Sequence, residues 1–113
     1  MTALRDRKCV ALATGTPPLD VAAVTRLKSQ IASDWSLAPD GKALLRDFRF
    51  KDFYRTMSFV NAVAHVANVE DHHPDLEIGY SHCRVIWSTH SVGGLSDNDF
   101  ICAAKLDALG GYT

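Results

Sequence analysis

The sequence contains no long apolar run and no excess of charge of either sign. No segment approaches the ~18 consecutive apolar residues that a transmembrane helix needs, so we expect no membrane span. The 12 Lys and Arg residues nearly balance the 13 Asp and Glu residues, and the net charge is −1. A chain without a positive patch has no field that attracts phosphate backbones, so we expect no direct nucleic-acid binding.

Cysteine is scarce and irregularly spaced. Cys9, Cys83 and Cys102 are odd in number and show neither the paired spacing of a zinc site nor a disulfide framework. The basic N-terminus is followed only by a short apolar stretch over residues 9–13, which is too small for a secretory signal. These features predict free thiols in a reducing compartment and a cytoplasmic protein.

The length and composition indicate one globular domain. A chain of 113 residues with 47% hydrophobic and 22% charged residues can form one core but not two. The turn-forming stretch 14–18 separates a loose N-terminal leader, expected over residues 1–18, from a folded domain expected over residues 19–113.

Hydrophobic periodicity predicts three helices and four strands. In chain order we expect a helix over 19–33, strands over 35–37 and 42–50, a helix over 52–70, strands over 76–80 and 82–90, and a helix over 100–109. Asp20 can cap the first helix, and Ser96 with Asp99 fits a capping box for the last. Short links between the strands favour an α+β two-layer domain, with a four-stranded antiparallel sheet and three helices on one face in the order α-β-β-α-β-β-α.

Histidine is concentrated in one part of the chain. Four of the five histidines, His72, His73, His82 and His90, fall within nineteen positions. Histidine exchanges protons near neutrality because its ordinary pKa is ~6.5. If the end of the helix over 52–70 meets the end of the strand over 82–90, His72 or His73 and His90 approach opposite edges of one flat ligand, which would make a proton-transfer site.

The histidines have two other interpretations. A single histidine at a turn is more often simply solvated, and His65 lies on a polar helical stripe where a surface or interface role is common. A metal site, as in a metal-dependent hydrolase, is not expected, because adjacent residues of an extended chain such as His72 and His73 point to opposite faces. His82 and Cys83 share that arrangement.

Several blocks of the chain together resemble the signature of the pterin-4a-carbinolamine dehydratase family. The blocks are Glu-Asp-His-His-Pro-Asp at 70–75, Tyr80, Val-Ile-Trp-Ser-Thr-His at 85–90, Gly-Leu-Ser at 94–96 and Asp-Phe at 99–100. The segment 48–53 also resembles the strand-to-helix junction of that family, and the likeness extends from about Leu19 to Leu109. The paired histidines, the Thr-His block and the Gly-Leu-Ser block in this order are far more specific than any one of them.

The resemblance implies the dehydration of 4a-hydroxytetrahydropterin, the 4a-carbinolamine, to quinonoid dihydropterin in tetrahydrobiopterin recycling, with no metal and no organic cofactor. It implies that His72 and His90 are the principal acid and base and that His73 binds and orients the pterin. The remaining residues that it implies at the substrate are Asp71, Pro74, Ser88, Thr89, Ser91, Val92 and Asp99. Capping of the last helix explains Asp99 equally well.

One position departs from the family pattern. Many members carry a glutamate four residues before the first histidine of the pair, where this chain has Asn68. Glu70 and Asp71 are the carboxylates that follow. Which carboxylate supports the histidines is therefore left open at this point.

A second function and a self-association are also considered. Some relatives act without catalysis, as a dimerisation cofactor of a transcription factor or in Rubisco assembly. The intact histidines weigh against a purely structural role. The wide apolar surface of the helix over 52–70 suits self-association, and the family likeness implies a homodimer or homotetramer.

Overall fold

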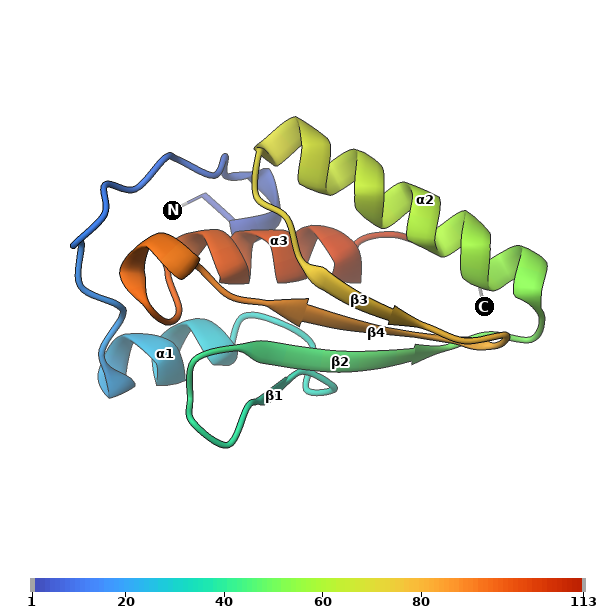
Figure 1. Cartoon of the computed structure of the whole chain (residues 1–113), viewed down its shortest axis with the longest axis horizontal. Coiled ribbons are helices and arrows are strands. Elements are labelled where there is room, and N and C mark those ends of the chain that lie inside the picture. Colours follow the sequence, from blue (N-terminus) through green and yellow to red (C-terminus); the bar gives the residue numbers. More distant parts are fainter. Residues whose placement is uncertain (1, 113) are drawn as a thin grey trace.

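The computed structural model describes residues 2–112, which form three α-helices and four β-strands (Figure 1). In chain order these are α1 (Val21–Lys28), β1 (Ser36–Leu37), β2 (Leu44–Arg49), α2 (Phe53–Glu70), β3 (Asp75–Ile78), β4 (His82–Trp87) and α3 (Asp97–Asp107), with two 3-10 turns, η1 (Leu4–Asp6) and η2 (His90–Val92). The predicted element order and fold class are confirmed. Met1 and Thr113, the outer ends of the predicted leader and domain, lie outside the described residues.

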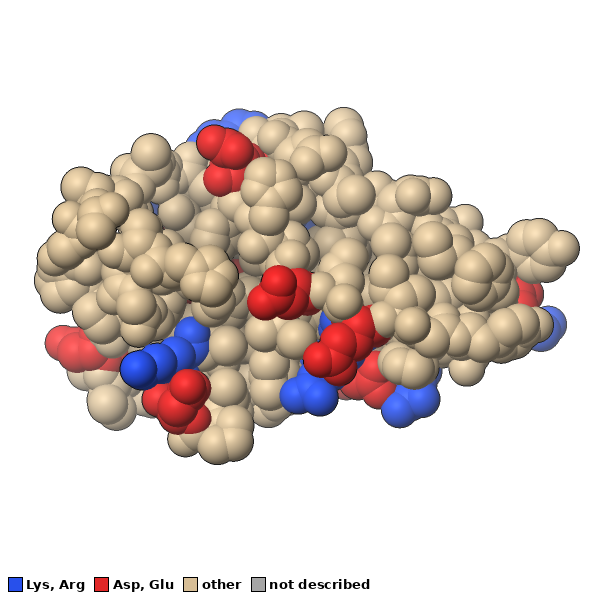
Figure 2. Space-filling view, viewed as in Figure 1, with Lys and Arg blue, Asp and Glu red and all other residues tan. Residues whose placement is uncertain are grey.

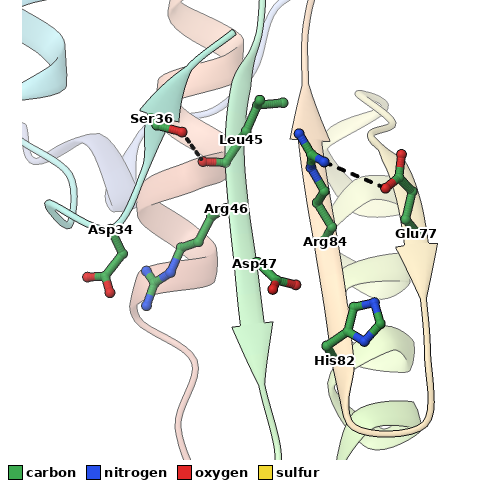
Figure 3. Close-up of a pocket in the computed structure, with 8 residues that line it drawn as sticks. All are labelled: Asp34, Ser36, Leu45, Arg46, Asp47, Glu77, His82 and Arg84. Atoms are coloured by element: carbon green, nitrogen blue, oxygen red, sulfur yellow. Dashed lines mark hydrogen bonds and ion pairs between the residues drawn. The ribbon is translucent and has the colours of Figure 1, made fainter.

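The four strands form one antiparallel sheet in the order β1-β2-β4-β3. β2 and β4 pair along their whole length, from Leu44 opposite Trp87 to Arg49 opposite His82. Side chains alternate between the two faces of a strand, so Val85 and Trp87 point into the core on the side that α2 and α3 cover. The other face of the sheet is open, and in Figure 3 the helices lie behind the strands.

The two long helices supply most of the core. Phe59, Val63 and Ala67 of α2 lie four residues apart along one buried face, as helical spacing predicts. The polar stripe predicted on α2 is exposed at Ser58, Asn61, His65 and Asn68. α3 is buried on nearly all sides between Asn98 and Ala104, because it lies between the sheet, α1, α2 and the N-terminal segment.

The capping predictions are confirmed at both helices for which they were made. The Asp20 side chain accepts a hydrogen bond from the Ala23 amide at the start of α1. Ser96 and Asp99 form a capping box, in which Asp99 accepts a hydrogen bond from the Ser96 amide. α3 therefore begins at Asp97, earlier than the predicted residue 100.

The first helix is shorter than predicted, because its exit is tied to the end of α3. α1 ends at Lys28, whereas periodicity suggested residue 33. The carboxylate of Asp107 accepts hydrogen bonds from the amide of Ala32 at 2.9 Å, from Trp35 Nε1 at 2.8 Å and from Arg46 Nη1 at 2.7 Å. The Ala32 amide is thus held by a side chain from another element, which a helical pattern within 19–33 could not indicate.

Part of the predicted leader over residues 1–18 packs against the rest of the chain. Leu4 is only 4% exposed, and Lys105 Nζ donates a hydrogen bond to the carbonyl oxygen of Arg5. Arg7 forms an ion pair with Asp97 at the start of α3, with a distance of 3.0 Å. Residues 4–10 are called the N-terminal segment below.

Length and apolarity together decide whether a helix could cross a bilayer. None of the helices between residues 2 and 112 is both long enough and apolar enough to do so.

Candidate active site

The end of α2 turns the paired histidines out of the helix. Asp71 adopts a left-handed conformation with φ of 52°, which Asp tolerates better than most residues, and its amide and that of His72 both donate to the carbonyl oxygen of Ala67. Pro74 disfavours helical geometry at the residue before it. His72 and His73 therefore leave the helix as extended chain that leads directly into β3.

His72 is held on two sides. Its ring stacks on Trp87 of β4 with 5.5 Å between ring centroids and an interplanar angle of 10°. Its Nε2 lies 2.7 Å from Oδ1 of Asp99 on α3, and the Asp99 side chain is fully buried. Since a carboxylate accepts hydrogen bonds, this contact favours the proton on Nε2, which leaves Nδ1 as the nitrogen that can act as an acceptor.

The second oxygen of Asp99 connects this histidine to the segment that leads to His90. Oδ2 accepts hydrogen bonds from Thr89 Oγ1 at 2.8 Å and from the Ser96 amide at 3.0 Å. The hydroxyls of Thr89 and Ser96 also lie 2.7 Å apart. Asp99 therefore caps α3 and holds His72 at the same time.

His90 borders a hollow of about 580 Å³ that runs from the open face of β2 and β4 past the end of β4, and His72 does not line it. The volume is within the ~300–1,000 Å³ of most small-ligand sites. The loop that carries it is closed by backbone hydrogen bonds between Thr89 and Gly94, and Gly93 takes the left-handed φ of 70° that the turn requires. The lining residues are Ala38, Pro39, Asp40, Lys42, Ala43, Leu45, Arg84, Ile86, Ser88, Thr89, His90, Gly93 and Gly94. Thr89 thus belongs both to this hollow and to the Asp99 network.

The predicted strand over 82–90 ends early because the Thr89 side chain is bonded to Asp99 and Ser96. β4 stops at Trp87, and the Thr89 side chain is turned toward Asp99 and Ser96. The chain then forms η2, in which Val92 is buried and Ser91 is half-buried. Neither residue lines the hollow beside His90.

The second histidine of the pair has a different environment. His73 is exposed, and its Nε2 lies 3.1 Å from Oδ1 of Asn68, one turn back on α2. Asp71 is exposed and Pro74 is half-buried. The structure therefore joins His72, Thr89 and Asp99 in one network and places Ser88 and His90 at the hollow, whereas His73, Asp71 and Pro74 line neither.

The structure assigns a partner to each member of the pair, which the departure at Asn68 had left open. Asp99 supports His72, and Asn68 supports His73. Glu70 points elsewhere, since it accepts a hydrogen bond from the Cys9 amide and lies 3.6 Å from Lys8 and 3.8 Å from Lys105. The stacking of Trp87 on His72 was not predicted.

Glu70 is a buried carboxylate with an ordered set of partners. Burial alone would raise its pKa, but the hydrogen bond from the Cys9 amide and the charges of Lys105 and Lys8 outweigh it, so the pKa of Glu70 lies below the usual 4.5. A depressed folded-state pKa stabilises the fold at pH values above about 4.5, and this contribution is lost as the pH falls through the folded-state value.

Glu70→Gln is therefore expected to lower the free energy of unfolding by about 1–2 kcal/mol at pH 7. The deficit should shrink as the pH is lowered below 4.5, because the carboxylate of the parent chain is then protonated as well. Denaturant unfolding at a series of pH values measures this. Glu77→Gln is the matched control, since its side chain is 62% exposed and lies 3.9 Å from Arg84, and it should change stability by less than about 0.5 kcal/mol. An equal deficit at pH 7 and pH 3 would contradict the assignment.

A second hollow, of about 530 Å³, lies on the open face of the sheet (Figure 3). It has a single histidine, His82, among charged neighbours. Arg84 forms an ion pair with Glu77 at 3.9 Å. Asp47, which also lines the hollow, forms an ion pair with Arg49 at 2.6 Å. These charges largely neutralise one another, so this face offers less for proton transfer than the His72–Asp99–Thr89 network.

No group of three or more His, Cys, Asp or Glu side chains within residues 2–112 is arranged to hold a metal ion. The chemistry available at the site is that of imidazole, carboxylate and hydroxyl groups. A small α+β protein with a buried aspartate bonded to a histidine, and with a hollow of ligand size bordered by a second histidine, has the groups that a candidate proton-transfer site would need.

Comparison with known proteins gives the family. A family model described as "Pterin 4 alpha carbinolamine dehydratase" matches residues 17–109, and the chain belongs to this family of hydro-lyases. A protein of Nitrosomonas europaea named "Putative pterin-4-alpha-carbinolamine dehydratase" is 53% identical over 106 residues, which cover 94% of this chain and 92% of the relative. A protein of the same name from Stenotrophomonas maltophilia is 52% identical over 106 residues, covering 94% and 90% of the two chains.

Two solved structures are similar to the chain. A "transcriptional coactivator/pterin dehydratase" from Brucella melitensis superposes with a TM-score of 0.78 at 29% sequence identity, over 83% of this chain and 99% of that one. A pterin dehydratase-like protein identified as a RuBisCO assembly factor of the alpha-carboxysome gives a TM-score of 0.58 at 20% identity, over 66% and 87% of the two chains. The second likeness shows the fold alone.

Proposed function

We propose that the chain dehydrates 4a-hydroxytetrahydropterin to quinonoid dihydropterin and water, as part of pterin recycling. The observation that carries the proposal is the position of His72, whose ring is oriented by a buried carboxylate that also binds Thr89 at the edge of the His90 hollow. Membership of the dehydratase family and the presence of all three signature histidines support it.

The reaction needs one base and one acid. The base removes the proton from N5 of the pterin, and the electrons of that N–H bond form a double bond between N5 and C4a. The C4a–O bond breaks at the same time, and the acid protonates the departing hydroxyl, which leaves as water. No electrons are gained or lost overall, so the proposed reaction needs no redox cofactor.

The surroundings of His72 and His90 favour His72 as the base and His90 as the acid. His72 is 12% exposed and has Nε2–H directed at Asp99, so its Nδ1 is the acceptor that a base requires. His90 is exposed at the hollow, where it can take up a proton from solvent and deliver it to the hydroxyl. Each positioned proton transfer is typically worth ~100- to 10,000-fold in rate.

The remaining predicted residues have supporting roles in this proposal. Ser88 lines the hollow and offers its hydroxyl group to the polar edge of a pterin, whereas Thr89, whose hydroxyl is bonded to Asp99 and Ser96, connects the hollow to the Asp99 network. His73, held by Asn68, would bind and orient the ring, with Asp71 and Pro74 fixing the backbone before it. Ser91 and Val92 of η2 are also proposed to bind the substrate.

The test is the rate at which freshly prepared 4a-hydroxytetrahydropterin disappears, followed by absorbance with and without the purified chain. We expect the chain to accelerate the loss, and we expect a His72→Ala/His90→Ala double variant that stays folded to leave the uncatalysed rate. A folded double variant as active as the parent chain would reject the proposal.

Self-association through α2 is part of the proposal. Residues 56–69 contain no charged side chain, and the surface over the middle of α2 is correspondingly free of charge in Figure 2. Large apolar side chains are exposed on α2 and along β3 and the turn after it, at Phe53, Tyr54, Val69, Ile78 and Tyr80. We propose a homodimer or homotetramer, and light scattering that finds only a monomer at assay concentrations would reject it.

A non-catalytic interaction role is the alternative function. The Brucella melitensis neighbour is described as both a coactivator and a dehydratase, so the two roles are not exclusive on this fold. Affinity capture from the native host with parent and double-variant chains separates them, because a scaffold keeps its partner when the histidines are gone. We also propose a cytoplasmic location, where the three free cysteines would stay reduced.

A further inference from the structure

Two cysteines that are far apart in sequence meet beneath the N-terminal segment. Cys9 Sγ lies 3.6 Å from Cys102 Sγ, although the residues are 93 positions apart. A disulfide bond is ~2.05 Å long, so the two sulfur atoms would have to approach by about 1.5 Å for a bond to form. Cys9 lies in irregular chain between η1 and α1, which can adjust more easily than a helix or strand.

We propose that Cys9 and Cys102 are a peroxide-oxidisable pair, and that the disulfide between them fastens the N-terminal segment to α3. This modification site is separate from the histidine network and does not depend on the dehydratase proposal.

The two thiols differ in exposure and in acidity. Cys9 is half-buried and can be reached by a small oxidant, whereas Cys102 is fully buried on α3 and contacts Cys9. The hydrogen bond to Cys9 and then burial raise the pKa of the Cys102 thiol well above its usual range. Cys102 therefore stays a protonated thiol, and Cys9 is the sulfur that meets the oxidant first.

The chemistry balances with hydrogen peroxide as the oxidant. The Cys9 thiol gives up its proton, and its thiolate attacks one oxygen of the peroxide. The O–O bond breaks, Cys9 becomes a sulfenic acid, and the second oxygen leaves as hydroxide, which takes up the released proton to form water. The sulfur of Cys102 then attacks the Cys9 sulfur, its proton passes to the departing hydroxyl, and a second water is released. Two thiols are oxidised to one disulfide, and one peroxide is reduced to two waters.

The contacts around Cys9 keep the pair in place. The Cys9 amide donates to Glu70 at the end of α2, and the Cys9 thiol lies 3.7 Å from the Asn98 carbonyl oxygen. The side-chain amide of Asn98 makes two hydrogen bonds to the backbone of Val10, at 3.1 and 2.8 Å, as a neighbouring strand would. These contacts hold Val10, the residue after Cys9, against α3 before the disulfide forms. Little conformational entropy is therefore lost on oxidation.

Cys83 provides an internal control. It is fully buried on β4, and burial, with a smaller effect from Asp47, raises the pKa of its thiol to about 11. Trypsin cleaves after Lys and Arg, which places the three cysteines on three different peptides, 9–26, 56–84 and 85–105. A cross-link is therefore assigned by mass alone.

The experiment treats the full, reduced chain with a small excess of hydrogen peroxide, blocks free thiols and maps tryptic peptides without reduction. We expect peptide 9–26 linked to peptide 85–105, an intact mass lower by two hydrogens, peptide 56–84 unlinked, and reversal by dithiothreitol. The oxidised chain should melt about 10 °C higher than the reduced chain, because the bond closes a long loop of the unfolded state.

Three variants decide the outcome. Cys83→Ala should keep the linked peptide, and Cys9→Ser should lose both the link and the rise in melting temperature while staying folded. Cys102→Ser should lose the same link. If Cys102→Ser does not fold because Cys102 is in the core, the Cys9→Ser result alone decides the outcome. A link between two chains, oxidation of Cys9 to sulfinic acid without a link, or a Cys9→Ser chain that still gains about 10 °C on oxidation would each overturn the proposal.

Discussion

Replacing His72 with alanine is expected to slow the dehydration of 4a-hydroxytetrahydropterin by about 100- to 10,000-fold. The ring is the group that Asp99 orients, and its removal takes away the acceptor nitrogen that we assign to the proton on N5. The decrease should appear in kcat, since the hollow beside His90 is lined by other residues and can still bind the pterin. Stopped-flow absorbance with freshly generated substrate measures both kcat and KM.

His65→Ala is the matched control for that experiment. His65 is exposed on the polar stripe of α2, so its loss should change kcat less than about twofold. A thermal melt of each variant shows whether the chain is folded, which matters because His72 also stacks on Trp87. A folded His72→Ala chain within a few-fold of the parent kcat would show that another group is the base.

The regular elements could be predicted because their signals are local. The helical periodicity of α2 and the capping box at Ser96 each depend on residues within one element, and both are confirmed. The order of these elements and their short links were enough to predict the sheet and the side on which the helices lie.

The ends of elements were predicted less well, because side chains from other elements decide them. Asp107, which holds Ala32, lies 75 positions away in sequence, and Asp99, which holds Thr89, lies on the next helix. The contacts of the N-terminal segment are also distant in sequence. Its hydrogen bonds to Glu70, Asn98 and Lys105 span 61 to 100 positions. Composition alone cannot reveal contacts of this kind.

The candidate site shows the same division. The clustering of histidines and the family resemblance gave the candidate residues, whereas the structure shows which side chains contact them. Asp99 was considered either as a helix cap or as a residue at the substrate, and its two oxygens allow it to cap α3 and to bind His72 together. Thr89 has a similar double position, at the hollow and on Asp99. We infer that the start of α3 is the element that holds both sides of the site in register.

Asp99→Ala is accordingly expected to affect both stability and activity. The carboxylate is fully buried and accepts hydrogen bonds from His72, Thr89 and the Ser96 amide, so its removal leaves three buried polar groups without their acceptor. The free energy of unfolding should fall by about 3–5 kcal/mol, as when one partner of a buried pair is removed. Urea unfolding measures that loss.

Asp99→Asn separates positioning from stability. Asparagine keeps the shape and one acceptor oxygen, so the loss of stability should be smaller than for alanine, but its amide nitrogen can donate to Nε2 of His72 and favour the tautomer that carries the proton on Nδ1. A base in the wrong tautomer should lower kcat by about 100- to 10,000-fold with little change in KM. Asp97→Asn, at the same helix end but half-exposed and paired with Arg7, should keep kcat within about twofold. If Asp99→Asn raised KM and left kcat unchanged, Asp99 would be a substrate-binding residue and His72 would not depend on it for orientation.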